Sequence, residues 1–140
     1  MNLKTRKIKL LSGVLTILLS AASFAAAQSD TTPKKRLRSP AVVRDIIGGE
    51  SHNSYVIRAP RGKTMTARAV WRPKSGNRVE FTVSKSANFF NAEQVGFGKE
   101  IDNDKGGKRS WTGKIPATRD YYIYVVGYPT VRYTLRVTVK

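Results

Sequence analysis

Hydrophobic and polar residues alternate through the last thirty residues of the chain, 111–140. From Tyr133 to Val139 every second residue is large and apolar, and arginines and threonines fill the positions between them. A period of two places the apolar side chains on one face of a β-strand and the polar ones on the other. The run from Tyr121 to Val125 alternates in the same way, and a short Gly-Tyr-Pro-Thr segment separates the two runs. This pattern predicts a β-hairpin whose apolar face a second sheet must cover.

Similar alternating runs, bounded by Gly- and Pro-containing turns, recur along the chain before this segment. They predict strands at 41–46, 54–59, 64–71, 78–84, around 95–97 and at 109–115. Strands that follow one another at intervals of about ten residues, with turn signals between them, are typical of β-sandwiches. The fold class predicted for residues 41–140 is therefore all-β, an antiparallel β-sandwich of about seven or eight strands.

The first 27 residues have the layout of a secretory signal peptide. Four basic residues precede an apolar segment that begins at Leu10, and the small residues Ala25-Ala26-Ala27 form a cleavage pattern before Gln28. The alternative is an uncleaved membrane anchor, because Leu10–Ala27 reaches the length that can span a bilayer. We expect cleavage after Ala27 and a periplasmic or extracellular product. Residues 28–40 are polar and basic without periodicity, which predicts a disordered linker.

Positive charge dominates the composition. The chain has 26 Lys and Arg against 9 Asp and Glu, a net charge of +17, and no cysteine. Loss of the four basic residues of the leader leaves 22 against 9, or +13. Such a charge attracts polyanions, and behind a signal peptide these are lipopolysaccharide, phospholipid head groups, anionic wall polymers or nucleic acid. The alternative is that the charge serves only solubility.

Basic residues gather at two kinds of place, the predicted linker and loops beside the two tryptophans, Trp71 and Trp111. The candidate binding residues are Lys34, Lys35, Arg36, Arg38, Arg72, Lys74, Lys105, Lys108 and Arg109. Aromatic rings beside cations suit sugars or single-stranded nucleic acid. The competing interpretation is that both tryptophans fill the core, as their inward strand parity favours.

Catalytic and metal-binding signals are weak. His52 is the sole histidine and is predicted to be a solvated loop residue; no Gly-x-Ser-x-Gly elbow surrounds any serine. One histidine without cysteine argues against zinc. The segment 102–107 begins like a calcium loop, but the twelfth position is Gly113 rather than glutamate, so a plain turn is favoured. We predict a non-enzymatic protein without cofactor or metal.

Two motifs carry a resemblance to a known family. One is Gly62-Lys-Thr-Met-Thr-Ala after a Pro turn. The other is Trp111-Thr-Gly-Lys-Ile-Pro-Ala-Thr-Arg-Asp-Tyr, followed later by Tyr133-Thr-Leu-Arg-Val. Together they resemble bacterial pre-peptidase C-terminal (PPC) β-sandwich domains, over roughly residues 46–139. Within that group the chain is similar to the small secreted forms that include the periplasmic inhibitors of goose-type lysozyme. The motif residues are ones that shape the fold, and Arg119 stands where the pattern usually has glycine.

Two functional hypotheses follow. The first is a secreted, non-enzymatic binding protein of the cell envelope, with lysozyme inhibition as the version that the resemblance implies. The second is a polyanion-binding module driven by the basic excess. Lysozymes are typically basic, so a strongly positive domain would repel such a target, which counts against the inhibitor version.

Overall fold

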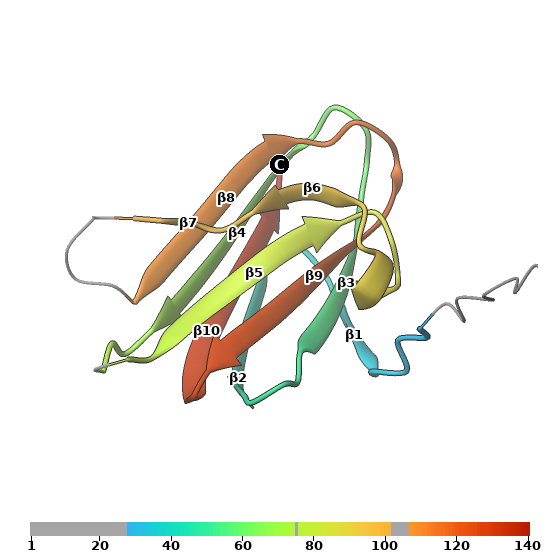
Figure 1. The fold of residues 1–140 in the computed structure, drawn as a ribbon. Helices are drawn as coiled ribbons and strands as arrows, with labels where there is room; N and C mark the ends of the chain where they lie inside the picture. Colours follow the sequence, from blue (N-terminus) through green and yellow to red (C-terminus); the bar gives the residue numbers. More distant parts are fainter. Residues whose placement is uncertain (1–27, 75, 102–106) are drawn as a thin grey trace, which may run out of the picture.

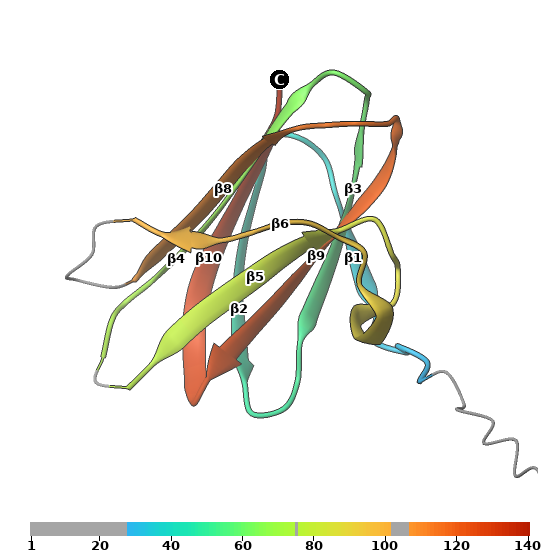
Figure 2. The same cartoon turned by 45° about the horizontal axis from the view of Figure 1, so that its top comes forward.

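A computed structural model describes residues 28–74, 76–101 and 107–140. These residues form ten strands in two facing five-stranded sheets (Figures 1 and 2). The predicted all-β sandwich is confirmed. There are more strands than the seven or eight expected because two short edge strands, Lys34–Leu37 and Lys99–Glu100, show no readable alternation. The predicted signal peptide at 1–27 lies outside the described residues.

Each sheet interleaves strands from distant parts of the chain. Sheet A has the order β1 (Lys34–Leu37), β3 (Asn53–Ala59), β9 (Arg119–Tyr128), β5 (Arg78–Ser84) and β6 (Gln94–Phe97). Sheet B has the order β2 (Ala41–Gly48), β10 (Thr130–Val139), β4 (Thr64–Trp71), β8 (Lys108–Lys114) and β7 (Lys99–Glu100). A single 3-10 turn, η1 (Phe89–Asn91), joins β5 to β6 in the described chain. All neighbours are antiparallel except β1 and β3, which run parallel.

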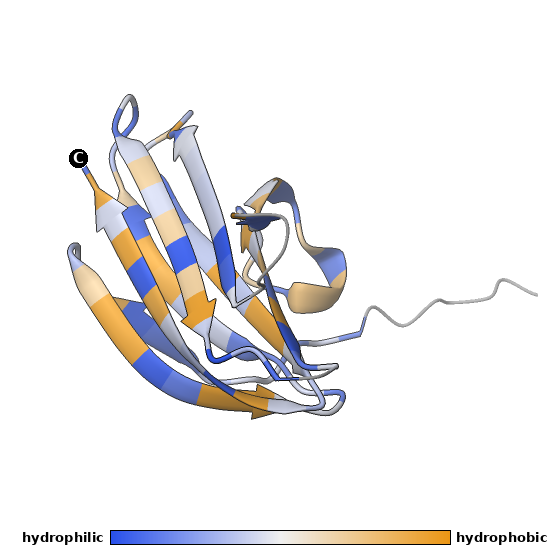
Figure 3. Cartoon of the chain, turned by 90° about the vertical axis from the view of Figure 1, so that its left-hand side faces the viewer, coloured by the Kyte–Doolittle hydropathy of each residue, from blue (hydrophilic) through white to orange (hydrophobic). Residues whose placement is uncertain are grey.

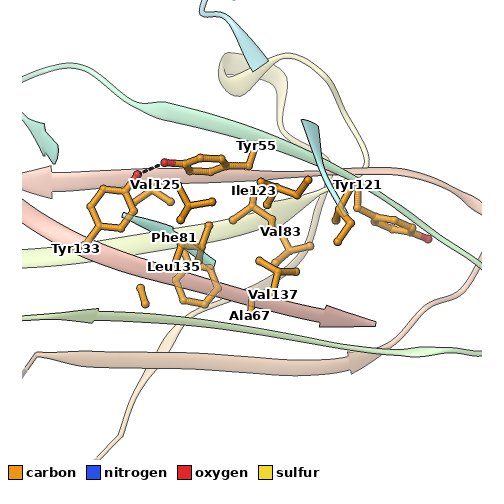
Figure 4. Packing of buried hydrophobic residues seen from close by; sticks show 14 of the residues in the cluster. Tyr55, Ala67, Phe81, Val83, Tyr121, Ile123, Val125, Tyr133, Leu135 and Val137 are labelled. Atoms are coloured by element: carbon orange, nitrogen blue, oxygen red, sulfur yellow. Dashed lines mark hydrogen bonds between the residues drawn. The ribbon is translucent and has the colours of Figure 1, made fainter. Parts of the chain in front are cut away.

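The core lies between the two sheets and consists of the inward side of each alternation. Figure 3 shows hydrophobic and hydrophilic positions succeeding one another along the strands. Leu135 and Val137 of β10 are 0% exposed, as are Ile123 and Val125 of β9, and Figure 4 shows them in one cluster. The inward positions predicted for these strands are confirmed.

Two tyrosines close one end of the core with a hydrogen-bond network. The hydroxyls of Tyr55 and Tyr133 bond to each other (Figure 4), and Tyr55 Oη donates to Asp45 Oδ2 at 3.0 Å. Asn53 Nδ2 donates to Tyr133 Oη at 2.8 Å. Burial raises the pKa of both tyrosines, and for Tyr55 the bond to Tyr133 raises it further. The hydroxyls therefore stay protonated and serve the fold.

The predicted hairpin at the end of the chain is wrong. β9 and β10 do not pair; β9 lies between β3 and β5 in sheet A, and β10 lies between β2 and β4 in sheet B. Their apolar sides face each other across the core, which satisfies the alternation of both runs without a hairpin. Gly127 permits the crossing, because a Cβ there would lie 2.5 Å from Ile47 Cγ2 and 2.7 Å from Val131 Cγ1.

The predicted disorder of residues 28–40 is corrected for Lys34–Leu37, which form β1 beside β3. Two long-range contacts hold this strand. Leu37 is only 7% exposed and joins the core, and Arg36 Nη2 lies 2.8 Å from Asp120 Oδ2 on β9. Four residues are too few to display a period, so composition alone misled the interpretation.

Asp30 fastens the segment before β1 to the domain. Its side chain is 1% exposed and accepts hydrogen bonds from the backbone N–H of Thr32 at 3.0 Å and of Phe89 at 3.2 Å. Lys34 Nζ and His52 Nε2 lie 3.4 and 3.2 Å from the carboxylate. Burial raises the pKa of Asp30, but these hydrogen bonds and the lysine charge lower it more, to about 2.

His52 is part of this arrangement and is not the solvated loop residue that the sequence predicted. Its side chain is 8% exposed. The ring stacks on Phe89 with 4.1 Å between centroids, and the ring of Tyr124 lies nearly perpendicular to it with 5.9 Å between centroids. The imidazole is packed on the outer side of sheet A as a structural group.

We expect Asp30→Asn to lower the free energy of unfolding at neutral pH by about 2 kcal/mol, because hydrogen bonds to a charged acceptor are lost. The pKa of Asp30 is about 2 in the folded state, below its ordinary 3.8. Its contribution is therefore complete above about pH 4 and disappears as the pH falls toward 2. Urea titrations at several pH values measure this. The difference between wild type and variant should shrink with acidification; a constant difference contradicts the assignment. Glu93→Gln, at an exposed position, is the control.

Candidate functional site

The outer face of sheet B concentrates positive charge. Because the inward positions of its strands fill the core, the alternate positions point to solvent. Those of β2, β10, β4 and β8 include Arg44, Arg132, Arg136, Arg68, Lys108 and Lys114, and Arg72 directly follows β4; all seven are exposed. The outward positions of these four strands contain no aspartate or glutamate. We call these seven residues the cationic face.

Strand register brings the arginines together from three strands. Arg136 on β10 lies directly opposite Arg68 on β4, and Arg44 on β2 lies opposite Thr134. Like charges placed directly opposite each other on neighbouring strands destabilise a sheet by roughly 0.2–1 kcal/mol. The Arg136–Arg68 pair therefore does not serve stability, which makes it a candidate for binding.

The five arginines of the cationic face have no carboxylate partner within the described ranges. Three exposed arginines of sheet A differ. Arg36 and Arg58 lie 2.8 and 3.9 Å from the carboxylate of Asp120, and Arg78 lies 3.8 Å from Glu80. The hydrogen bond from Arg36 lowers the pKa of Asp120. These three arginines therefore have a carboxylate beside them on sheet A, whereas the guanidinium groups of the cationic face have none in the described chain and are available to an anion.

One end of the cationic face is hollowed into a groove of about 560 Å³. Three arginines and one carboxylate line it, and the arginines outnumber the carboxylate, which accepts a hydrogen bond from Tyr55; the lining includes Arg44, Arg72, Arg132, Asp45, Ile46, Val70 and Thr134. Ile46 is 50% exposed, so the groove combines guanidinium groups with aliphatic surface. Such a surface can form charge-assisted, bidentate hydrogen bonds to phosphate or carboxylate and also contact an apolar group.

The candidate residues chosen from the sequence are only partly brought together. Arg72 and Lys108 belong to the cationic face, and Lys74 is exposed in the loop after β4. Arg109 points to the other side of β8, where it bonds the carbonyl of Gly98 at 3.3 Å and Glu100 at 3.0 Å. Lys105 lies outside the described residues.

The basic run of the predicted linker belongs to the other sheet. Lys34 lies against Asp30 and Arg36 against Asp120, while Lys35 and Arg38 are exposed. β1 is the edge strand of sheet A, so none of these four residues contributes to the cationic face.

Sequence reasoning missed Arg44, Arg68, Arg132 and Arg136 as candidates. A signal was present, because each occupies the outward position of an alternating strand. None of them has a basic residue directly beside it in the sequence, and an isolated basic residue is typical of ordinary solvated surface. Only the strand order of sheet B makes them neighbours.

Both tryptophans point toward the core, as their positions in the alternating strands predict. Trp71 is 7% exposed within the core, as the core interpretation predicts. Trp111 is half-buried and packs on the core from the open edge of the sandwich, where a Cβ at Gly96 would lie 1.9 Å from its Nε1. A second hollow of about 410 Å³ lies beside it, between β6 and β8, with Phe97 and Lys99 on its border.

Within residues 28–74, 76–101 and 107–140, no three acidic, histidine or cysteine side chains converge in the manner of a metal site. The same part of the chain has no helix suited to crossing a bilayer. Most of the segment 102–107, weighed above as a calcium loop, lies outside the described residues.

Comparisons with known proteins place the fold. No family model matches the chain, and no curated protein matches it in sequence. The structure is similar to the pre-peptidase C-terminal domain of a Bacillus anthracis collagenase, with a TM-score of 0.63 and 16% identity over 79% of this chain and 100% of that domain. It is similar to PliG of Aeromonas hydrophila, a periplasmic inhibitor of g-type lysozyme, with a TM-score of 0.59 and 22% identity over 76% of this chain and 96% of the inhibitor.

A third similar structure is CorA of Methylomicrobium album, a surface-associated copper-binding protein, with a TM-score of 0.59 and 10% identity over 78% of this chain and 98% of that chain. Neighbours with such different ligands and such low identity establish a shared fold and no shared activity. The chain has the β-sandwich fold of pre-peptidase C-terminal domains and PliG inhibitors, as its motifs predicted.

Proposed function

We propose that this chain is a non-enzymatic binding protein for polyanionic components of the cell envelope, either polymers or lipid surfaces, and that it binds them through the cationic face. The observation that carries the proposal is the set of five exposed arginines on one sheet face without a carboxylate partner in the described chain. The envelope location rests on the predicted signal peptide.

Sheet geometry suits this role. Neighbouring strands lie about 4.8 Å apart, and successive outward residues of one strand are about 7 Å apart. The arginines therefore form an array whose spacing resembles that of phosphates or carboxylates along a polymer. A bound anion between Arg136 and Arg68 also removes their mutual repulsion, so the free energy lost on folding is recovered on binding.

The binding test is salt dependence. The chain from Gln28 onward contains every described strand and core residue, so this form can be studied alone. If five to seven cations each release a counterion, log Kd against log salt should have a slope of roughly 4 to 6 with a duplex polyanion as ligand. Retention on heparin and titration with a labelled DNA duplex measure it, and neutral dextran is the control. Affinity that ignores salt, or no binding at low salt, contradicts the proposal.

A second candidate function is inhibition of a goose-type lysozyme, supported by the fold shared with PliG. Mixing the purified domain with such a lysozyme and following lysis of cell walls tests it. Unchanged lysis at micromolar excess of the domain removes this candidate. The positive charge of the domain disfavours a basic enzyme as target, so we place it second.

A further inference from the structure

Two strongly exposed aliphatic side chains interrupt the cationic face at its edge. Val42 is 55% exposed and Ile46 is 50% exposed, and both point outward from β2, on either side of Arg44. In Figure 3, β2 at the edge of sheet B shows two hydrophobic stretches separated by a hydrophilic one. A soluble polyanion offers these side chains nothing to contact, so charge alone does not account for them.

The pairing register of β2, β10 and β4 places aliphatic and basic residues side by side across the sheet. Val42 lies opposite Arg136, which lies opposite Arg68. In the next row Arg44 lies opposite Thr134, which lies opposite Val70. Each aliphatic side chain thus has a guanidinium group beside it in its row or on its own strand. The face as a whole is basic and amphiphilic.

From this arrangement we infer that the partner of the cationic face is the surface of an anionic lipid bilayer. The inference rests on the proposed function and names its ligand. Guanidinium groups bind the headgroup phosphates, and Val42 and Ile46 enter the boundary between headgroups and acyl chains, as the apolar side of an interfacial helix does. Because β2 is the edge strand, its aliphatic side chains stand at the margin of the sheet, where they can reach below the headgroups.

The opposite face lacks this combination. The outward side of sheet A carries Asp120 and Glu80, which pair with its arginines, and the aromatic packing of His52 and Phe89. An anionic bilayer would meet carboxylates there. Charge complementarity therefore selects sheet B as the side that faces the lipid.

The test compares vesicles with a soluble polyanion. The chain from Gln28 onward is mixed with vesicles of phosphatidylglycerol and phosphatidylcholine, and separately with heparin. We expect Val42→Thr/Ile46→Thr to weaken the vesicle partition about tenfold, because two half-exposed aliphatic groups lose their apolar environment. Threonine keeps the β-branched shape that suits a strand. Heparin affinity should stay within about twofold, because no charge changes.

Phe97→Thr, at a 48% exposed apolar residue of sheet A, is the control and should change neither the vesicle partition nor the heparin affinity.

The outcomes separate the two proposals. A vesicle partition unchanged in the Val42→Thr/Ile46→Thr variant overturns the lipid inference, as does a wild type that binds heparin but ignores anionic vesicles; the polyanion function then stands, with a hydrophilic polymer as ligand. A wild type that binds neither overturns both. Loss of heparin and vesicle binding together in the variant, with the fold intact by circular dichroism, also overturns the lipid inference.

Discussion

Replacing Arg68 and Arg136 with glutamate should weaken binding to heparin by about a hundredfold or more at low salt, since each basic group near an anionic surface contributes roughly 1 kcal/mol and two charges reverse sign. The two side chains lie opposite each other at the centre of the cationic face. Their reversal removes two anion contacts and places two carboxylates where the polymer must pass. The slope of affinity against salt should also fall. Titration with heparin across a salt series measures both effects.

The matched control is Arg58→Glu/Arg78→Glu, which changes the net charge by the same amount on sheet A. These arginines are exposed and lie near Asp120 and Glu80. We expect a loss of less than about fivefold, caused by the lower net charge alone. An equal loss in both double variants would show that total charge, rather than the cationic face, determines binding. Thermal unfolding of both variants checks that the sandwich is intact.

Leu135→Ala should lower the free energy of unfolding by about 3 kcal/mol, because a large buried side chain is replaced by a cavity. Leu135 is 0% exposed, and its strand partners are Val43 on β2 and Ala69 on β4. The chain has no cysteine, so no disulfide supplements the core. A small domain with a total stability of about 5–15 kcal/mol loses a large share of it through this one change. Urea unfolding followed by circular dichroism is the measurement.

Arg136→Ala, one residue further along the same strand, is the control for this prediction. Its side chain points to solvent opposite Arg68, so its removal should change stability by no more than about 0.5 kcal/mol and relieves a repulsion. Substitutions at these two adjacent residues of β10 are thus expected to differ severalfold in the change of the free energy of unfolding. A shift below about 1 kcal/mol for Leu135→Ala would contradict the position of β10 as an inner strand of sheet B, between β2 and β4.

Local alternation was sufficient to predict most strands. The predicted spans 64–71 and 78–84 coincide with β4 and β5, and the short strand around 95–97 is β6. These strands could be predicted because the alternation of inward and outward side chains is visible in consecutive residues of the sequence. The failures, β1 and the supposed hairpin, depend on which distant strand lies alongside, and alternation carries no information on that.

The prediction of the candidate binding residues was incomplete for the same reason, since it also depends on which distant strands lie side by side. Clustering along the chain selected the basic run at 34–38, yet the structure pairs two of its residues with carboxylates of the same domain. The arginines that do converge come from three strands far apart in sequence. Arg44, Arg68 and Arg136 become neighbours only because β10 lies between β2 and β4. A prediction of the site required the strand order of sheet B in advance.

The position of the final two strands has a consequence for the order in which this molecule can form. β9 fills the gap between β3 and β5, and β10 fills the gap between β2 and β4. Until residues 119–139 are available, sheet A lacks its central strand and sheet B lacks the strand that joins β2 to β4, so a chain that is still being synthesised cannot complete the core. We expect such a chain to remain unfolded until its last segment is released. An unfolded chain is the form that passes through a narrow export channel, so late closure of both layers is compatible with the export that the predicted signal peptide implies.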